Sequence, residues 1–369
     1  MKNFLVLGIG NAQVDLLRYL KLKNEFCVYA LSNSMEGRGY QYADKFDLID
    51  ITDKEAVLQY ALENNINYIY SIGSDVAMPT VAYVAEKLSL PCFVNYTTAL
   101  TCNNKDMFRK ELADCYGSVP HVVITSLDQL DSVACLRFPV IVKPVDSQGQ
   151  RGVGTAASVQ EVKALYDEAI THSRSGKVIV EEKIEGEEIS VNAYVSNSEL
   201  VFSLSSGRVS WPQFDGGVIH KHFLPSAISE VAEANVQRLV KKSIAKLDIT
   251  NGPVYFQIKM NGDEPYLIEV TPRFDGCHMW KLIKEANGID LLNILVNHLM
   301  GEAPKLSTVS TSSQPFILEF HCFPPEHVFV TPEKDDQAVY EELYYCNGDT
   351  VRRMNGKMEK CGYKVYPSV

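Results

Sequence analysis

The stretch that ends at Arg273 constrains the fold more than any other part of the chain. Residues 254–260 and 266–270 are two apolar-rich runs, and Asn261-Gly262 between them is typical of a tight turn. The pattern predicts a β-hairpin.

The polar residues of this hairpin indicate a site for a metal and a phosphate. In a hairpin, Gln257 and Glu269 can lie near each other across the two strands. Amide and carboxylate oxygens are ligands that Mg²⁺ prefers, and Arg273, just past the second strand, can neutralise developing phosphate charge. The alternative interpretation is an ordinary surface hairpin with a solvated glutamate.

Composition limits the class of protein. The 369 residues are enough for roughly two to three domains, and 46% hydrophobic with 22% charged residues is typical of a soluble globular protein. A net charge of −11 argues against nucleic acid or an anionic membrane as a partner. The nine cysteines form no CxxC pair, and no apolar run approaches the ~20 residues of a membrane span, so we expect a cytoplasmic protein.

The first 100 residues alternate short apolar runs with amphipathic segments, which predicts a parallel sheet flanked by helices. The expected strands cover residues 4–7, 27–31, 68–72 and 92–94, and the expected helices cover residues 12–20, 54–63 and 76–88. Asp75 suits the N-terminus of the last helix.

The remainder mixes strands and helices with less regular spacing. A helix is expected from Lys105 toward residue 115, and residues 203–225 are expected to be irregular. Further helices are expected at residues 159–169, 231–247, 281–285 and 291–299, and further strands at 140–142, 178–182, 189–195, 316–320 and 363–366.

The turn after the first strand invites a dinucleotide-binding interpretation. It reads Gly8-Ile9-Gly10-Asn11-Ala12-Gln13, so Gln13 replaces the third glycine of the nicotinamide fingerprint. No acidic residue ends the second strand to bind a ribose. The pattern therefore favours a plain tight turn over NAD(P) binding.

Lys143 ends a Val/Ile-rich strand, where an ammonium group is unfavourable unless it meets an anion. The loop that follows contains Gly149 and Gly152, and its backbone N–H groups could close over phosphates. A strand-edge lysine beside an ordinary hairpin loop is the alternative. Further on, residues 180–188 run from an apolar strand into an acidic linker, either a solvated turn or a hinge that contacts adenine and uses Glu188 as a ribose acceptor.

These blocks, in this order, resemble the ATP-grasp superfamily of carboxylate–amine ligases, which includes D-alanine–D-alanine ligase, biotin carboxylase and carbamoyl phosphate synthetase. The resemblance covers roughly residues 1–310 and implies an α/β (α+β grasp) fold. It implies a Rossmann-like domain at residues 1–100, one grasp subdomain with the phosphate-covering loop at 101–180, a second with the metal and substrate site at 181–310, and a small β-rich extension at 311–369.

The resemblance also implies site residues. The nucleotide contacts are Lys105, Lys143, Ser147, Gly149, Gly152, Glu181, Glu182, Ile184, Glu188 and Ile268, and the metal ligands are Gln257, Glu269 and Thr271. Thr271 stands where the family usually has asparagine, and we hypothesise weaker binding of a second metal. Arg273, Lys143 and His220 are implied in catalysis. Apart from the family motifs, Arg208, His220 and Asp275, together with Arg273, are candidates for contact with the substrate.

Several of these assignments have plain alternatives. Arg208 and His220 could be polar surface residues, and Asp275 and His278 could either orient an amine or belong to a packed corner. Cys277 is interpreted as a small buried residue rather than a nucleophile.

The implied function is an ATP-dependent ligase that joins a small carboxylic acid to an amine through an acyl phosphate, with release of ADP and phosphate. The implied cofactor is Mg²⁺, with Mn²⁺ able to replace it, and family habit favours a homodimer. A phosphotransferase on the same scaffold, a nucleotide-binding protein with degenerate catalysis and a nicotinamide oxidoreductase are the alternatives.

Overall fold

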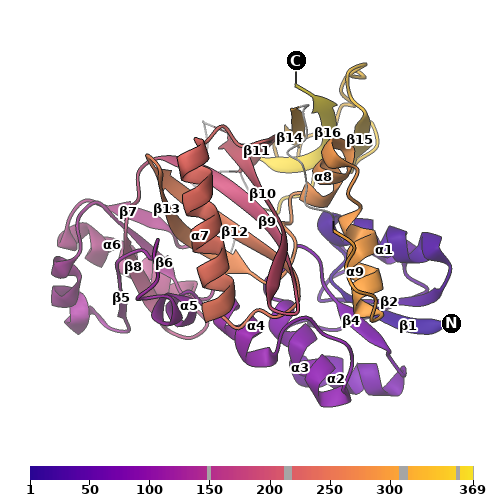
Figure 1. Ribbon diagram of the computed structural model, residues 1–369, viewed down its shortest axis with the longest axis horizontal. Helices are drawn as coiled ribbons and strands as arrows, with labels where there is room; N and C mark the ends of the chain where they lie inside the picture. The colour runs from indigo at the N-terminus through magenta and orange to yellow at the C-terminus, as the bar shows by residue number, and fades with distance from the viewer. Residues whose placement is uncertain (148–150, 212–217, 307–314, 355–357, 369) are drawn as a thin grey trace.

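The structure is a computed structural model that describes residues 1–147, 151–211, 218–306, 315–354 and 358–368. Three β-sheets carry helices on their faces (Figure 1). This arrangement confirms the predicted α/β class. No helix in the described ranges is long and apolar enough to cross a membrane.

The first sheet is parallel, with strand order β3-β2-β1-β4. Its strands are β1 (Lys2–Leu7), β2 (Phe26–Ser32), β3 (Lys45–Leu48) and β4 (Tyr68–Tyr70), and its helices are α1 (Asn11–Lys23), α2 (Lys54–Glu63) and α3 (Met78–Leu88), with a 3-10 turn at Gly39–Tyr42. The residues from Phe4 to Leu7 are fully buried because helices cover both faces of a parallel sheet.

The turn after β1 shows why its glycine pattern departs from the nicotinamide fingerprint. Gln13 is buried and donates a hydrogen bond to the carbonyl of Ile72. Its side chain packs against Gly8 and Gly10, so that a Cβ atom at Gly10 would lie 3.0 Å from the Gln13 Oε1. The glutamine therefore fills the space beside the turn.

Two local predictions in this region are wrong. Residues 92–94 form a bend, in which Phe93 packs edge-on against Tyr70 with ring centroids 5.8 Å apart. Helix α3 begins at Met78, with a proline in its first turn, so Asp75 lies before the helix and does not cap it.

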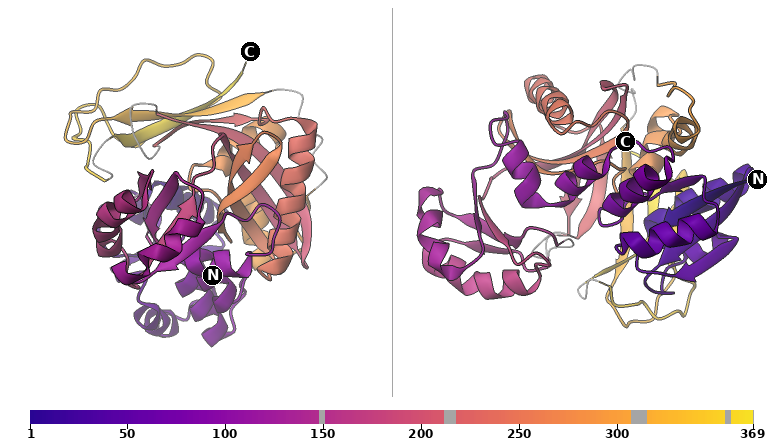
Figure 2. Two further views of the ribbon diagram at one scale, coloured as in Figure 1. Left: turned by 90° about the vertical axis from the view of Figure 1, so that its left-hand side faces the viewer. Right: turned by 90° about the horizontal axis from the view of Figure 1, so that it is seen from below.

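The second sheet is antiparallel and has its own hydrophobic core. With its helices it forms a separate lobe of the molecule (Figure 2). Two short helices, α4 (Tyr96–Asn103) and α5 (Lys105–Glu111), lead into it from the first domain. Its strands, in spatial order, are β5 (His121–Ile124), β8 (Val178–Glu182), β6 (Val140–Pro144) and β7 (Gly154–Ala156), covered by α6 (Val159–Thr171) and a 3-10 segment at Leu127–Cys135. The core of this lobe is formed by apolar side chains of β6, β8 and α6, separate from the main core.

The third sheet has eight strands in the described residues, and α7 (Glu230–Lys246) packs across β13 and β10 on one face (Figure 1). Its order is β13 (Glu264–Thr271), β12 (Gly252–Asn261), β9 (Glu187–Ser196), β10 (Glu199–Ser210), β11 (Ile219–Leu224), β14 (Phe316–Phe323), β16 (Glu359–Pro367) and β15 (Tyr340–Leu343). The prediction that residues 203–225 are irregular is wrong, since β10 and β11 occupy most of this stretch.

The predicted hairpin is β12–β13, and its turn uses Gly262 at a φ of 59°, which favours glycine. A β-bulge in β13 leaves Ile268 without a cross-strand partner, because Gln257 pairs with Glu269 and Ile258 pairs with Leu267.

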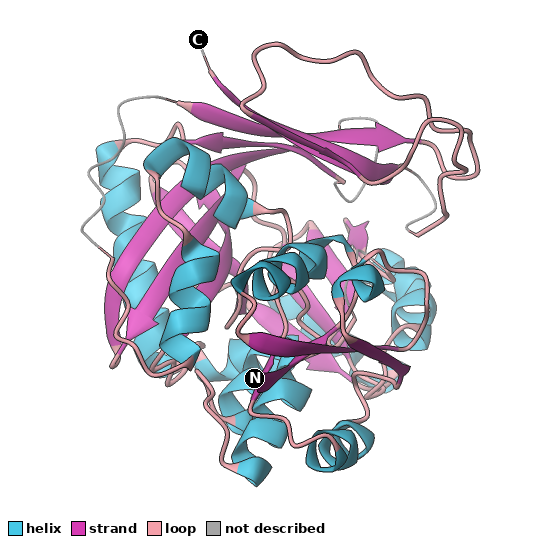
Figure 3. Ribbon diagram, turned by 90° about the vertical axis from the view of Figure 1, so that its right-hand side faces the viewer, coloured by secondary structure: helices cyan, strands magenta, loops and turns pink. Residues whose placement is uncertain are grey.

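The C-terminal strands continue the third sheet and reach the first domain (Figure 3). Glu342 on β15 binds Arg18 at 3.0 Å and Arg38 at 2.9 Å. Helices α8 (Met279–Asn287) and α9 (Leu291–Leu299) lie between the hairpin and these strands. The domain boundaries that we predicted from the resemblance stay predictions.

Candidate active site

The polar face of the third sheet brings the predicted metal ligands together. Gln257 on β12 lies opposite Glu269 on β13. Two residues away on each strand, the next such pair is Tyr255 and Thr271. Side chains alternate along a strand, so these four share one face, opposite the apolar face that α7 covers.

These residues fit a hard cation such as Mg²⁺. Gln257 donates its Nε2 hydrogen to Glu188 at 2.7 Å, which turns its Oε1 oxygen away as a free acceptor. Glu269 faces the same space, and the buried Thr271 Oγ1 has no hydrogen-bond partner. Amide, carboxylate and hydroxyl oxygens are the donor set that Mg²⁺ binds. The metal roles of the three residues stay predictions.

Lys143 lies in a buried group that we call the Glu181 network, formed by Arg109, Lys143 and Glu181. Glu181 accepts from Arg109 Nε at 2.7 Å and binds Lys143 Nζ at 2.6 Å. Burial alone would raise the pKa of Glu181, but the two cations hold it well below its usual range. Burial lowers the pKa of Lys143, partly offset by the charge of Glu181. Every charge in this network has a partner.

Arg109 connects the two antiparallel sheets. Its guanidinium donates to the carbonyl oxygens of Leu267 and Ile268, the latter at 3.2 Å, as well as to Glu181. Ile268, the residue that the bulge leaves unpaired, is thus bound by Arg109 of α5, whose guanidinium also binds Glu181 in the second sheet. Ile268 was predicted as a nucleotide contact, and its backbone lies beside this network.

Lys105, the first residue of α5, contacts the start of the loop that was predicted to cover phosphates. Its ammonium donates to the backbone oxygen of Ser147 at 2.8 Å, and its charge contributes to lowering the pKa of Lys143. Gly149 lies outside the described residues. Gly152 has a φ of 67° and packs against the C-terminal end of α6, where a Cβ atom would lie 3.2 Å from Ala169 Cα.

The predicted hinge lies between β8 and β9. Ile184 is buried, and Gly186 passes so close to β12 that a Cβ atom would lie 1.7 Å from the Met260 carbonyl oxygen. The Glu182 carboxylate accepts from the Arg137 backbone at 2.9 Å and pairs with the exposed Arg137 side chain at 3.2 Å. Its side chain therefore has a structural partner at the start of β6.

Arg273 is held between the hairpin and the first domain. Its Nε donates to Asp75 at 2.7 Å and its NH1 donates to the Phe274 carbonyl at 2.8 Å. Gly73 and Gly276 allow this approach, because a Cβ atom at Gly73 would lie 2.9 Å from Gly276 Cα. Asp75, which does not cap a helix, anchors Arg273 instead.

The two predicted substrate residues on β10 and β11 lie in different surroundings. Arg208 binds Glu188 at 3.0 Å and donates to the Tyr255 hydroxyl at 2.9 Å, inside the polar face. His220 contacts Glu319 at 3.0 Å and stacks on Trp211, with ring centroids 3.9 Å apart. Burial lowers the pKa of His220, and Glu319 offsets part of this effect. His220 therefore has partners of its own, away from the hairpin.

A second buried group, the His222 cluster, consists of His222, Asp275 and Cys277. Its potential ligand atoms lie within 4.8 Å of one another, and all three residues are buried. Both ring nitrogens of His222 and the Oδ2 of Asp275 have no hydrogen-bond partner. Burial lowers the pKa of His222 to about 3 and raises the pKa of the Cys277 thiol to about 11.

His278, the other residue of this corner, is fully engaged in packing. Its ring contacts Asp15 and the Tyr344 hydroxyl, each at 2.7 Å, and stacks on Tyr363 at 4.2 Å. The packed-corner interpretation therefore describes His278.

The sequence reasoning missed the site roles of two residues, Arg109 and Asp75, and did not separate His222 from its neighbour His220. Asp75 follows the carboxyl end of β4, the place where ligand-binding residues of parallel sheets gather, and this signal could have found it. His222 lies two residues from His220 on the same strand, but the sequence could not say which of them is buried. Arg109 carried no signal beyond its position on a helix that starts at Lys105.

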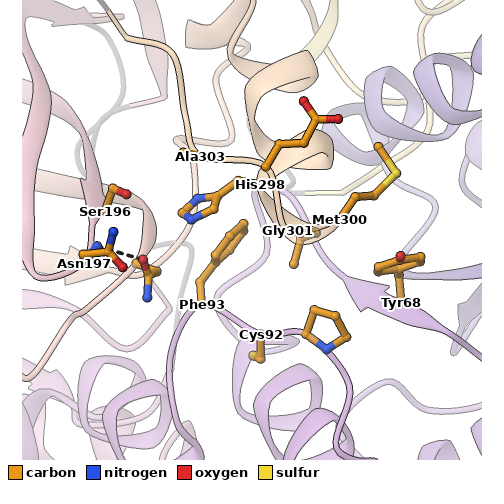
Figure 4. A pocket seen from close by; sticks show the side chains of 13 residues that line it. Tyr68, Cys92, Phe93, Ser196, Asn197, His298, Met300, Gly301 and Ala303 are labelled. Carbon is orange, nitrogen blue, oxygen red and sulfur yellow. Dashed lines mark hydrogen bonds between the residues drawn. The ribbon is translucent and has the colours of Figure 1, made fainter.

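A pocket of about 420 Å³ lies elsewhere, where the turn after β9 and the end of α9 meet the first domain (Figure 4). Phe93 and His298 lie side by side at its wall, with ring centroids 5.0 Å apart. None of the predicted site residues lines it. It is therefore separate from the polar face of the third sheet.

Residues 136–280 match the family model described as ATP-grasp domain, which spans the second sheet, the hairpin and Arg273. The chain contains an ATP-grasp domain. The Glu181 network, the predicted metal ligands and the His222 cluster all have members within it, and the ATP-grasp resemblance drawn from the sequence is confirmed.

The similarity to curated proteins is distant. The chain is 24% identical over 257 residues to formate-dependent phosphoribosylglycinamide formyltransferase of Rhodococcus jostii, covering 67% of this chain and 62% of that protein. It is 23% identical over 280 residues to phosphoribosylamine–glycine ligase of Halalkalibacterium halodurans, covering 69% and 63%. The match thus spans less than two thirds of the length of these relatives.

The fold extends beyond the matched domain. The crystal structure of L-amino acid ligase from Bacillus licheniformis aligns with a TM-score of 0.80 at 17% identity, covering 100% of this chain and 93% of that one. The likeness shows that the fold of that structure extends over the whole of this chain.

Proposed function

We propose that the chain is an ATP-dependent ligase that joins a carboxylic acid to an amine through an acyl phosphate and releases ADP and phosphate. The observation that carries this proposal is the polar face of β12 and β13, where Gln257 and Glu269 lie directly opposite each other inside an ATP-grasp domain. Two of the proteins to which the chain is similar are named ligases.

The residues around this face supply what binding of a nucleoside triphosphate needs. Gln257, Glu269 and Thr271 would hold Mg²⁺, which when bound neutralises phosphate charge and orients the phosphates. Lys143, on β6 of the second sheet, and Lys105, at the start of α5, would bind phosphate oxygens. Glu181 holds Lys143 in place until the phosphates arrive.

Arg273 would stabilise the transferred phosphoryl group. Its pairing with Asp75 keeps the guanidinium fixed beside Tyr255, whose ring lies 5.3 Å from it. A fixed donor costs no reorganisation when charge develops in the transition state. Arg208, held by Glu188 and Tyr255, would contact the substrate. Glu188, whose second oxygen lies 3.8 Å from the Lys259 ammonium, would accept from a ribose hydroxyl.

The chemistry requires no nucleophilic side chain. A carboxylate oxygen of the substrate bonds to the γ-phosphorus as the bond from that phosphorus to the bridging oxygen breaks, which releases ADP. The amine nitrogen then bonds to the acyl carbon, phosphate leaves, and the amine gives up a proton. Positioning and charge neutralisation provide the catalysis.

The finer parts of the proposal concern conditions and assembly. We expect Mn²⁺ to replace Mg²⁺, because the donors are oxygens. We also expect small-molecule substrates, a homodimer and a cytoplasmic location, which agrees with nine free cysteines. Light scattering after gel filtration measures the oligomeric state.

The test is a screen for ADP release across pairs of acids and amines, repeated with hydroxylamine in place of the amine. A ligase forms an acyl hydroxamate that depends on ATP and on the acid. The Glu269→Gln variant should lower the rate by about 10²–10³-fold. Glu264→Gln is the matched control, since Glu264 is exposed on the same strand and contacts the Tyr116 hydroxyl at 2.6 Å.

Other outcomes point to the alternatives. A stable phosphorylated product that needs no amine would indicate a phosphotransferase. Nucleotide binding without turnover on any pair would indicate degenerate catalysis. Equal rates for Glu269→Gln and the native protein would contradict the metal role of Glu269.

A further inference from the structure

The His222 cluster contains buried polar atoms that the proposed ligase mechanism does not use. His222 is 0% exposed and Asp275 is 4% exposed, yet both nitrogens of the one and an oxygen of the other have no partner. An unpartnered buried polar group destabilises a fold by about 1–3 kcal/mol. Two such residues facing each other and a thiol therefore indicate a ligand between them.

The spacing of these atoms sets the size of that ligand. His222 Nε2 and Asp275 Oδ2 are 4.0 Å apart, too far for a direct hydrogen bond. A water molecule hydrogen-bonded to all three residues fits this spacing as it stands, because two atoms each about 2.8 Å from a common centre lie about 4.6 Å apart in tetrahedral geometry. A metal ion with bonds of about 2.0–2.3 Å to nitrogen, oxygen and sulfur needs ligand atoms about 3.3–3.8 Å apart, so the cluster, whose atoms lie within 4.8 Å of one another, would contract on binding it.

The nearby charges argue against an anion. Arg208 is already paired with Glu188 at 3.0 Å, so its charge is compensated. An anion in the cluster would also meet the free carboxylate oxygen of Asp275. Lys360 lies 3.5 Å from the Cys277 sulfur and 3.6 Å from the centre of the Phe320 ring, a position from which its N–H can donate to a thiolate.

We propose that His222, Asp275 and Cys277 bind a divalent transition metal, with Zn²⁺ the best match to one nitrogen, one oxygen and one sulfur ligand. Three protein ligands leave a fourth position for water or for a substrate atom. The all-oxygen set at Gln257, Glu269 and Thr271 suits Mg²⁺, so the two sites differ in the metals that they select.

The position of the cluster gives the metal a structural consequence. His222 lies on β11, whereas Asp275 and Cys277 lie in the connection between β13 and α8, directly after Arg273. A bound ion would link this connection to β11, in the middle of the sheet. The link would fix the backbone next to Arg273, whose side chain is also held by Asp75.

The test measures metal binding to the full chain by itself. The protein is stripped with chelator, titrated with Zn²⁺ and then with Co²⁺, whose spectrum reports sulfur ligation through a charge-transfer band in the near ultraviolet. We expect one metal per chain with that band, and a rise in Tm with Zn²⁺ that persists in the Glu269→Gln variant. Cys277→Ser should abolish the band, and Cys277→Ser and Asp275→Asn should each weaken Zn²⁺ binding by at least ~10²-fold.

Matched variants separate this site from other thiols and from the ligase site. Cys102→Ser removes a buried cysteine on α4 and should leave the band unchanged. Glu269→Gln should keep Zn²⁺ binding, so failure of the ligase proposal and failure of this one can be distinguished. A cobalt complex without the sulfur band, equal Zn²⁺ affinity in Cys277→Ser, or no stoichiometric binding would overturn the proposal and leave a buried water as the occupant.

Discussion

The Glu181 network and the His222 cluster are both buried, both polar and both built across separate segments of the chain, but they differ in one respect. In the network, one carboxylate serves two cations at 2.7 Å and 2.6 Å. In the cluster, three polar atoms have no partner. The first is complete in the structure as it stands, whereas the second requires a further ligand.

The comparison shows two different roles for buried polar groups. A paired network fixes the geometry of its surroundings, and here it holds the second sheet against the bulge of β13 through Arg109. Breaking it leaves uncompensated charges inside the protein. An incomplete cluster instead provides binding free energy for the group that completes it.

The largest expected effect comes from breaking the network. Glu181→Gln leaves Arg109 and Lys143 without a buried carboxylate, so we expect the free energy of unfolding to fall by about 3–5 kcal/mol. Urea denaturation followed by circular dichroism measures it. A loss below about 1 kcal/mol would show that solvent or backbone groups replace the carboxylate.

A partly buried pair should have an intermediate effect that depends on pH. Burial raises the pKa of Glu342, but its bonds to Arg18 and Arg38 lower it overall from 4.5 to about 2. The unfolded chain therefore takes up a proton first as the pH falls, and the stabilisation present above pH 4.5 is lost toward pH 2.

We expect Glu342→Gln to lower the free energy of unfolding at pH 7 by about 1–2 kcal/mol, discounted for solvent screening. The difference in the free energy of unfolding between the native protein and the variant should shrink as the pH falls from 4.5 to about 2. A difference that stays constant from pH 7 to pH 3 would contradict the ion pairs of Glu342 with Arg18 and Arg38. Denaturation curves at several pH values provide the measurement.

A smaller effect of opposite sign is expected in the cluster without metal. His222→Leu replaces two unpartnered nitrogens with an apolar side chain of similar size, so the free energy of unfolding should rise by about 1 kcal/mol in the presence of chelator. With Zn²⁺ the order should reverse, because only the native protein gains from binding. Destabilisation in chelator would mean that His222 already has a partner.

The smallest effect is expected one residue from the network. Glu182 pairs with Arg137, whose side chain is 74% exposed, so solvent replaces the pair easily. Glu182→Gln should change the free energy of unfolding by less than about 1 kcal/mol. This variant is the matched control for Glu181→Gln, and a similar loss in both would remove the contrast between buried and exposed pairs.

Local patterns predicted most elements whose spacing is regular. The hairpin of β12 and β13 and helix α9 were predicted with bounds close to those observed, because turn residues and apolar periodicity are local properties. The pattern failed where partners are distant. β10 and β11 were missed, and Asp75 was given to a helix when its partner is Arg273, 198 residues away.

The same division holds within the site. Lys143, Gln257 and Glu269 could be proposed from the sequence, since their chemistry is unusual for the strands that carry them. That Glu181 neutralises Lys143, that Arg109 joins two sheets and that His222 rather than His220 is buried could not. These facts depend on which strands become neighbours.

The amino-acid sequence by itself determined the α/β class, the hairpin and the residue types available to bind phosphate and metal. These features follow from short-range periodicity and side-chain chemistry, which are local properties of the sequence. Only the tertiary structure decided which of those side chains are paired and which are left without partners. Pairing depends on burial and on approach within a few ångströms of residues far apart in the chain, which no local pattern specifies.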